Sequence, residues 1–311
     1  MGMFLVAVLV GFAVGVISGL FGIGGGTIMV PVFRLGFALR ALQATATSLF
    51  VIIPTSISGV VGHLRGKTCV VPLGLAAGLG GALTSPVGVY LATISPPWAL
   101  MLGAGAVITY SSITMFRKAM AAPKANEAAS ARAAEAARPA SATDSGRGQA
   151  VAGAAPASAH VPEAAHPAPA RASAASAPAE DGFAVQRKHI VIAALIGVAA
   201  GVMSGYVGVG GGFLMVPLFL AIIGLPMKKA SGTSLVAMPI LVLPGVVEQL
   251  VWGNVDVVVG IAMAIGTIPG ALVGARIMRR VPERSLRFGF AITMICIAIF
   301  LVVNEVALSA A

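Results

Sequence analysis

Charged side chains are scarce in this sequence. Asp, Glu, Lys and Arg make up 10% of its 311 residues, whereas apolar residues make up 58%. Because charged residues account for about 25% of an ordinary soluble domain, this composition excludes a soluble globular fold. Acidic residues are especially rare, since residues 1–126 contain no Asp or Glu. The chain is therefore expected to be an integral membrane protein with a basic charge balance.

The residues that build most catalytic and metal sites are also rare. The two cysteines, Cys69 and Cys296, provide neither a disulfide framework nor the spacing of metal ligands. The apolar segments contain no cluster of His, Asp and Glu and no Ser-His pairing suited to hydrolysis. Neither an ATP-binding loop of the form GxxxxGKS or GxxxxGKT nor a dinucleotide fingerprint occurs. We therefore expect no enzymatic activity, no metal, no cofactor and no nucleic-acid partner.

The sequence contains several long apolar segments. A helix needs about 20 mostly apolar residues to cross a bilayer, and windows near this length occur at residues 3–20, 45–62, 70–93, 98–115, 190–204, 234–251, 257–275 and 288–303. These windows are apolar on every side, unlike the alternating strands of a transmembrane barrel. The sequence therefore predicts an all-α polytopic membrane protein.

Residues 119–186 interrupt the apolar pattern. Ala, Pro and Ser dominate there, and the tract AAPASAHVPEAAHPAPARASAASAPAED contains no aromatic residue. Such a segment cannot bury enough surface to offset its ordering entropy. It is predicted to be a disordered linker between a first membrane repeat, residues 1–118, and a second, residues 187–311. A metal site at His160 and His166 in this tract is not expected.

The two membrane regions repeat one another at an offset of 186 residues. The longest match is GLFGIGGGTIMVP, from Gly19 to Pro31, with GYVGVGGGFLMVP, from Gly205 to Pro217. Further matched pairs are Ser18 with Ser204, Thr47 with Thr233, Ser48 with Ser234, and Gly59 with Gly245. We expect a duplicated membrane unit whose halves pack face to face around a pseudo-two-fold axis.

The number of membrane segments in each half decides the relative orientation of the halves. Five segments per half, ten in total, give inverted repeats with both termini outside and the linker in the cytoplasm. Four per half, eight in total, give parallel repeats. Lys and Arg concentrate in cytoplasmic loops, and the basic segments that begin at Arg187 and Arg276 share one side only in the ten-segment arrangement. That arrangement is preferred, although it places Arg34 and Arg40 outside, and the eight-segment arrangement stays open.

The glycine triplets indicate a broken helix in each half. Glycine costs about 1 kcal/mol relative to alanine in a helix, and proline cannot form the usual helical hydrogen bond. The stretch from Gly22 to Pro31 is therefore predicted to be an unwound section followed by a short half-helix. Irregular backbone within a membrane is tolerated only inside protein or beside a watery cavity, so the two breaks are expected to form a substrate site. Unpaired N–H groups at the start of a half-helix favour an anion.

The residues expected to bind substrate are the glycines of both breaks and the nearby hydroxyls that recur in both halves: Ser18, Gly22, Gly24, Gly25, Gly26, Thr47, Ser48, Ser204, Gly208, Gly210, Gly211, Gly212, Thr233 and Ser234. Pairs one turn apart, such as Gly11 and Gly15, are instead expected to let helices pack closely. Glu248 and His63 are ionisable side chains near the membrane interior, and either could carry a coupling proton. Both also lie close to predicted loops, where interfacial anchoring is an equal alternative.

The motifs of both halves are similar to those of a known family. SGLFGIGGGTIMVP and SGYVGVGGGFLMVP, followed at matched distances by ATATSL and ASGTSL, resemble the TauE/SafE family of membrane permeases, often labelled sulfite exporters. The resemblance covers both halves and excludes the linker. It implies transport of small sulfur-containing anions, such as sulfite or organosulfonates, across a bacterial inner membrane. The long linker departs from the compact loops typical of that family.

The expected function is therefore secondary transport of a small anion by a multi-pass protein of the bacterial inner membrane. A passive anion channel is an alternative, since broken helices suit both. A membrane scaffold or receptor that acts through the linker is a second alternative. A homo-oligomer and an unidentified partner of the linker both stay open.

Overall fold

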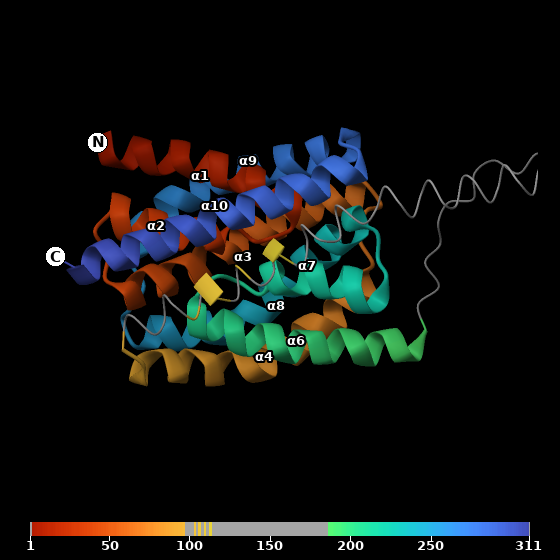
Figure 1. The fold of residues 1–311 in the computed structure, drawn as a ribbon, viewed down its shortest axis with the longest axis horizontal. Coiled ribbons are helices and arrows are strands. Elements are labelled where there is room, and N and C mark those ends of the chain that lie inside the picture. Colours follow the sequence, from red (N-terminus) through yellow and green to blue (C-terminus); the bar gives the residue numbers. More distant parts are fainter. Residues whose placement is uncertain are drawn as a thin grey trace, which may run out of the picture. The chain divides into compact units, whose positions relative to one another are not determined.

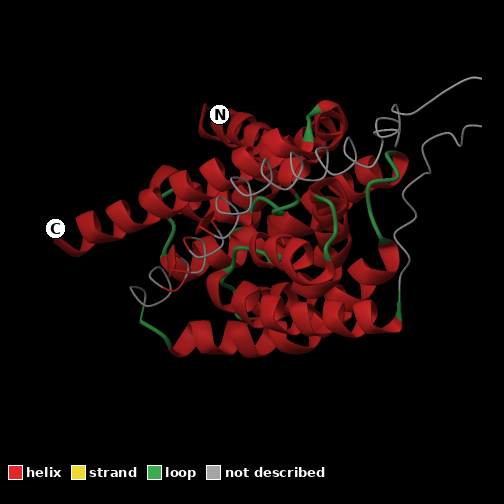
Figure 2. Ribbon diagram, turned by 45° about the vertical axis from the view of Figure 1, so that its right-hand side comes forward, coloured by secondary structure: helices red, strands yellow, loops and turns green. Residues whose placement is uncertain are grey.

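The computed structural model describes residues 2–96, isolated helical positions between 103 and 113, and residues 186–310. Every regular element in these ranges is a helix (Figures 1 and 2). The elements are α1 (Gly2–Phe21), α2 (Gly26–Gly36), α3 (Ala41–Arg65), α4 (Val71–Ile94), α6 (Arg187–Val207), α7 (Gly212–Leu218), the π-helix η1 (Phe219–Ile223), α8 (Met227–Val251), α9 (Val257–Arg280) and α10 (Glu283–Ala310). Residues 119–185 of the predicted linker and most of the window at 98–115 lie outside the described residues.

Six of the described helices are long and apolar enough to cross a membrane, namely α1, α3, α4, α6, α8 and α9. Their outward side chains include large apolar ones such as Leu9, Leu83 and Leu195, each more than half exposed. Such surfaces suit contact with lipid tails. The prediction of an all-α membrane protein is confirmed.

The first glycine break reverses the direction of the chain. Gly22, Gly24 and Gly25 separate α1 from α2 with φ angles of 72°, 80° and 79°, a left-handed region that only glycine enters without strain. The 11 residues of α2 span about 16 Å, which is too short to cross a bilayer. This half-helix returns toward the end where α1 begins, because Phe37 just after α2 and Phe4 in α1 line the same small hollow.

The second break has the same construction. Gly208 and Gly210 have φ angles of 72° and 69°, and α7 begins shortly afterwards at Gly212. The 7 residues of α7 pass directly into the π-helix η1, whereas α2 stays α-helical beyond its Pro31. The predicted glycine-broken helix is therefore present in both halves, although the second changes pitch.

A close helix pair joins the start of the first half to the second half. α1 packs along α9, and Gly11, Gly15 and Gly19 face, in the same order, the backbone of Met263, Thr267 and Ala271. A Cβ atom at Gly15 would lie 2.5 Å from the carbonyl oxygen of Thr267, so only glycine permits this approach. The matching order of contacts shows that α1 and α9 are parallel. The expectation that Gly11 and Gly15 serve helix packing is confirmed.

A second pair of this kind joins the other ends of the halves. α6 packs along α4 in Figure 1, and Gly197, Gly201 and Gly205 face, again in order, Ala77, Gly81 and Ser85. These two helices are therefore also parallel. Each half contributes its first long helix to one pair and a later helix to the other, so the halves interlock.

The central helices α3 and α8 run antiparallel. Gly59 of α3 faces Leu235 of α8, whereas Leu49 of α3 faces Gly245 further along α8. α3 is parallel to α9, since successive contacts join Thr47 with Asp256 and Thr55 with Thr267. α8 is parallel to α4 by the same criterion, with facing pairs Gly74–Val236 and Gly81–Leu241.

Corresponding helices of the two halves consequently point in opposite directions. α1 opposes α6, α3 opposes α8, and α4 opposes α9. These are the directions of the inverted arrangement and not of the parallel one, because each glycine break turns the chain back before the next long helix. The beginning of α1 and the end of α10 lie at the same end of the bundle (Figure 1). The origin of the halves by duplication stays a prediction.

Substitution of Gly15 by alanine should weaken the α1–α9 pair. The new methyl group would meet backbone atoms of Thr267 at 2.5–3.0 Å, and overpacking of this kind costs about 1–3 kcal/mol. The apparent melting temperature of the purified protein in detergent should fall. Gly36→Ala is the matched control, because a Cβ at Gly36 would contact no atom within 4 Å; an equal fall in both variants would contradict close packing at Gly15.

Candidate functional site

The two glycine breaks touch one another in the middle of the structure. The carbonyl oxygen of Val209, within the second break, lies 2.4 Å from the position that a Cβ atom of Gly26 would take. The carbonyl oxygen of Gly22, in the first break, lies 2.4 Å from the position that a Cβ atom of Gly212 would take. All four residues are buried. We call this meeting of the breaks the break contact, and the structure thus brings together the glycines that the sequence predicted to form one site.

Two serines hold the backbone of the break contact. Ser48 of α3 donates its hydroxyl hydrogen to the carbonyl oxygen of Gly208, and Ser234 of α8 donates to that of Gly22, at 2.7 Å. These carbonyls lie where α6 and α1 end, and such terminal groups need a partner outside the helix. Each serine therefore binds the break of the opposite half, and its hydroxyl hydrogen is committed to protein backbone.

Apolar side chains cover the glycines from both sides. A Cβ atom at Gly24 would collide with the sulfur of Met238, and one at Gly210 would lie 2.6 Å from Cδ1 of Ile52. Met238 and Ile52 are fully buried and occupy matching positions in the two halves. Gly211 packs against Ala200 of α6. Sequence reasoning missed Met238 and Ile52, although both lie one helical turn after the paired serines.

Four buried hydroxyl groups near the breaks have no hydrogen-bond partner within the described part of the chain: Ser18, Thr27, Ser204 and Ser231. Ser18 lies beside Gly25, since its Cβ is 3.5 Å from the position of a Cβ there. Thr27 belongs to the first turn of α2. An unpaired buried polar group costs about 1–3 kcal/mol, so these hydroxyls are available to a polar ligand.

The two breaks differ in polarity. Thr27 corresponds at the 186-residue offset to Phe213 in the second half, which has no hydrogen-bonding group. The counterpart of Ser231 is Thr45, whose hydroxyl donates to the carbonyl oxygen of Leu42 at 2.8 Å. Neither Thr27 nor Ser231 was predicted, because neither has an identical residue at the matching position of the other half. Ser231 of α8 lies beside the first break, since a Cβ atom at Gly22 would be 2.3 Å from its carbonyl oxygen. Among the described residues, the first break therefore has more unpartnered hydroxyl groups nearby than the second.

Thr47 and Thr233 act away from the break contact. The hydroxyl oxygen of Thr47 accepts a hydrogen bond from the N–H of Asp256, and that of Thr233 accepts one from the N–H of Val70, both at 3.0 Å. Asp256 and Val70 immediately precede α9 and α4. The two threonines therefore fix the starts of these helices, and the structure gives them a positioning role at matching places.

His63 occupies a hydrogen-bonded position at the end of α3. Its Nε2 atom lies 3.0 Å from the carbonyl oxygen of Gly19, and its Nδ1 atom lies 2.9 Å from the hydroxyl of Thr68. A carbonyl can only accept, so Nε2 carries hydrogen. Gln249 is the counterpart of His63 in the second half, and its side-chain oxygen accepts from Asn254 at 2.7 Å. The fully buried His63 therefore connects the last turn of α1 with the α3–α4 connection.

Glu248 lies at the opposite end of the bundle from His63, close to the end of α8. Its side chain is half-buried, and its Oε2 atom is buried with no hydrogen-bond partner among the described residues. The two predicted coupling residues are thus not brought together. Neither is part of the break contact.

Hydrogen-bond donors gather at the start of α2, beside the break contact. The first N–H groups of α2 have no acceptor within that helix, and the helix dipole gives its start a partial positive charge. The hydroxyls of Ser18 and Thr27 add donors beside this start. No carboxylate among the described residues lies in the breaks, since the acidic residues with described side chains are Glu248, Asp256 and Glu283.

The chain is similar over nearly its whole length to proteins described as probable membrane transporters. It shares 24% identity over 301 residues with the probable membrane transporter protein YunE of Bacillus subtilis (strain 168), covering 94% of this chain and 95% of YunE. It shares 24% identity over 288 residues with the probable membrane transporter protein YdhB of the same organism, covering 92% and 95%. A shorter similarity, 30% over 132 residues, joins it to the probable membrane transporter protein MamO of Paramagnetospirillum magneticum (strain ATCC 700264 / AMB-1) and covers 40% of this chain and 21% of MamO.

No solved structure is matched. The family described as sulfite exporter TauE/SafE matches residues 7–301, a range that includes both glycine breaks and all or most of each long helix of the described residues. The chain therefore belongs to the TauE/SafE family and is a membrane transporter of that family.

Proposed function

We propose that the chain is a secondary transporter of a small anion, which binds at the first glycine break where α2 begins. The observation that carries the proposal is the pair of buried, unpartnered hydroxyls of Ser18 and Thr27 beside the start of that half-helix. Hydroxyl and backbone N–H donors without a compensating carboxylate favour a negatively charged ligand. The description of the matched family as sulfite exporters supports a sulfur-containing anion such as sulfite or an organosulfonate.

The tight break contact supports a carrier more than a channel. Backbone atoms of the two halves meet there without space for a methyl group at Gly26 or Gly212, so an ion cannot pass through this arrangement. Transport requires the halves to separate at the breaks, which is the behaviour of a transporter with a site at the interface of inverted repeats. A passive channel would instead give very large unitary currents in electrical recordings.

Flux into proteoliposomes tests this function. Purified protein should take up one of sulfite, sulfate, thiosulfate or a small sulfonate in a saturable way, faster when a proton gradient is imposed. Deletion of residues 119–186 should leave this uptake in place, whereas a scaffold acting through the linker would lose its function. Absence of saturable flux for every one of these anions would contradict the proposed substrate class.

Gly26→Ala should impair transport much more than Gly36→Ala. A methyl group at Gly26 would collide with the carbonyl oxygen of Val209 and reach Ile52 at 2.8 Å, whereas one at Gly36 meets nothing within 4 Å. An overpacking cost of about 1–3 kcal/mol corresponds to a loss of roughly 5- to 150-fold in the population of the packed state. Initial rates of uptake, normalised to inserted protein, provide the comparison. Equal rates in the two variants, both on α2, would remove the break contact from the transport cycle.

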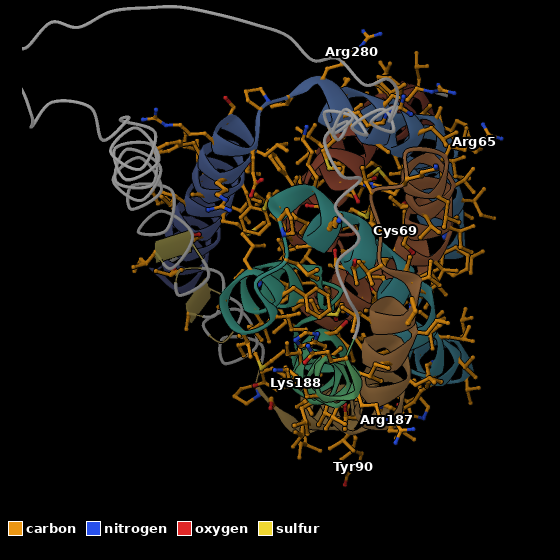
Figure 3. The ribbon with its side chains drawn as sticks, turned by 90° about the vertical axis from the view of Figure 1, so that its right-hand side faces the viewer. Arg65, Cys69, Tyr90, Arg187, Lys188 and Arg280 are labelled. Carbon is orange, nitrogen blue, oxygen red and sulfur yellow. The ribbon has the colours of Figure 1, made fainter. Side chains whose placement is uncertain are left out.

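We also propose that the linker faces the cytoplasm. Of the thirteen Lys and Arg in the described ranges, eleven lie at one end of the bundle, which we call the basic end: Arg65, Lys67, Arg187, Lys188, Lys228, Lys229, Arg276, Arg279, Arg280, Arg284 and Arg287. Figure 3 looks onto this end, with Arg65, Arg187, Lys188 and Arg280 labelled. Only Arg34 and Arg40 lie at the other end. Positive residues favour the cytoplasmic side, and α6 begins at the basic end directly after the linker.

Reporter fusions test this orientation. A reporter that is active only outside the cytoplasm should be active when fused after Ala311, because α10 runs away from the basic end. The same reporter inserted within residues 140–160 should be inactive. A cytoplasmic reporter provides the converse readout for both positions. The opposite pattern would reverse the proposed orientation.

Glu248 is the proposed carrier of the coupling proton, and His63 is proposed to hold α1 in place. The Glu248 carboxylate oxygen lacks a partner, as a group that exchanges protons requires, whereas both ring nitrogens of His63 are occupied. Glu248→Gln should abolish the dependence of uptake on an imposed proton gradient. His63→Gln, which installs the residue found at the corresponding position of the second half, should retain that dependence. The reverse result would assign the proton to His63, and gradient dependence in both variants would remove both residues from coupling.

A further inference from the structure

The end of α9 carries an arginine-lined hollow. Its described lining consists of Val273, Arg276, Ile277, Arg279 and Arg280, and its volume is about 530 Å³. All three arginines are exposed. We call this feature the arginine hollow. It lies at the basic end, away from the break contact.

The positive charge of the arginine hollow is not compensated by any carboxylate among the described residues. Glu283 is the acidic residue next to it in sequence, and this side chain already binds Arg287 at 2.5 Å and the N–H of Met227 at 3.1 Å. Lys228 adds a further positive charge, since its Nζ atom donates to the carbonyl oxygen of Arg279 at 3.1 Å. Clustered like charges repel one another, so an anion bound at this position would be stabilised by several positive charges.

The hollow continues an apolar surface that faces away from the bundle. Ile261, Ile265 and Ile268 are 48%, 49% and 40% exposed, and Ile277 beside the arginines is 41% exposed. Ile261, Ile265 and Ile268 lie one turn apart along one face of α9, and Arg276 and Arg279 follow on that face, eight and eleven residues after Ile268. The opposite face of α9 packs on α1 through Gly266, Gly270 and Gly274. The arginines therefore end a lipid-facing stripe and do not line a path toward the glycine breaks.

We propose that the arginine hollow binds the headgroup of an anionic phospholipid whose acyl chain lies along the isoleucine stripe of α9. Guanidinium groups match phosphate oxygens with paired hydrogen bonds, and basic pockets on the cytoplasmic side of membrane proteins suit anionic headgroups. Arg276 and Arg280 lie one turn apart on the exposed face and hold the phosphate. Val273, about one turn deeper in the membrane than Arg276, contacts the first carbons of the acyl chain.

Lipid retention by the full-length protein tests the site. The wild-type protein should be reconstituted into nanodiscs of phosphatidylcholine with or without phosphatidylglycerol, extracted in mild detergent, and examined by native mass spectrometry and thermal melting. The wild type should retain phosphatidylglycerol in preference to phosphatidylcholine and melt at a higher temperature with it. This arm needs no variant. Equal retention of both lipids would overturn the proposal.

Paired variants locate the binding. Arg276→Gln combined with Arg280→Gln should weaken retention of phosphatidylglycerol by about 25-fold, since each basic residue near an anionic membrane contributes roughly a fivefold effect. Arg187→Gln combined with Lys188→Gln removes the same charge from the same end, where Figure 3 shows these residues far across the view from Arg280, and should leave retention unchanged. An equal loss in both pairs would reduce the effect to general surface charge and overturn the site.

Two further arms distinguish other occupants. Inorganic phosphate should fail to raise the melting temperature as phosphatidylglycerol does; an equal rise would identify a free-anion site without a lipid. Deletion of residues 119–186, which contain Glu180 and Asp181, should not change lipid retention. A marked gain in retention after that deletion would show that the linker itself occupies the hollow, contrary to the proposal.

Discussion

The approach of two backbone segments at the break contact is the constraint on which the rest of this structure depends. Gly26 and Gly212 can lie against the opposite break only because neither carries a Cβ atom. The breaks in turn expose carbonyl groups at the ends of α1 and α6, and Ser48 and Ser234 satisfy them from the other half. The glycines and the serines are therefore parts of one arrangement. Substitution of either affects how the two halves meet.

The glycine-lined helix pairs at the sides of the bundle explain how such a contact is maintained. In each of these pairs, α1 with α9 and α4 with α6, a helix of one half packs on a helix of the other half. The two backbones approach one another over three successive turns. At the break contact backbone also meets backbone, but there the side chain of Met238 additionally covers Gly24. Methionine adapts its shape with little cost. Met238 is thus a place where the packing beside the break contact can adjust.

The positively charged residues are distributed by the end of the bundle at which they lie and not by the half to which they belong. Corresponding helices of the two halves point in opposite directions, so equal charges at corresponding positions would fall at opposite ends of the bundle. Instead, eleven of the thirteen Lys and Arg in the described ranges lie at the basic end, as shown by Arg65 at the end of α3 and Arg280 at the end of α9 (Figure 3). The corresponding end of α8 carries Glu248 and Trp252. Such a one-sided charge distribution is the pattern that membrane insertion favours.

The amino-acid sequence alone determined the membrane class, the broken helix in each half, the family and the glycines at which the helices break, because hydropathy, glycine triplets and a repeated motif are local features. It did not decide between parallel and inverted halves, since the direction in which Gly22 to Gly25 turn the chain depends on φ angles that glycine leaves open. Only the tertiary structure showed that Thr47 and Thr233 fix the starts of other helices, and that Thr27 and Ser231 carry free hydroxyls. Those assignments depend on which residues meet across the two halves, more than 150 positions apart in the sequence, and no spacing within one half contains that information.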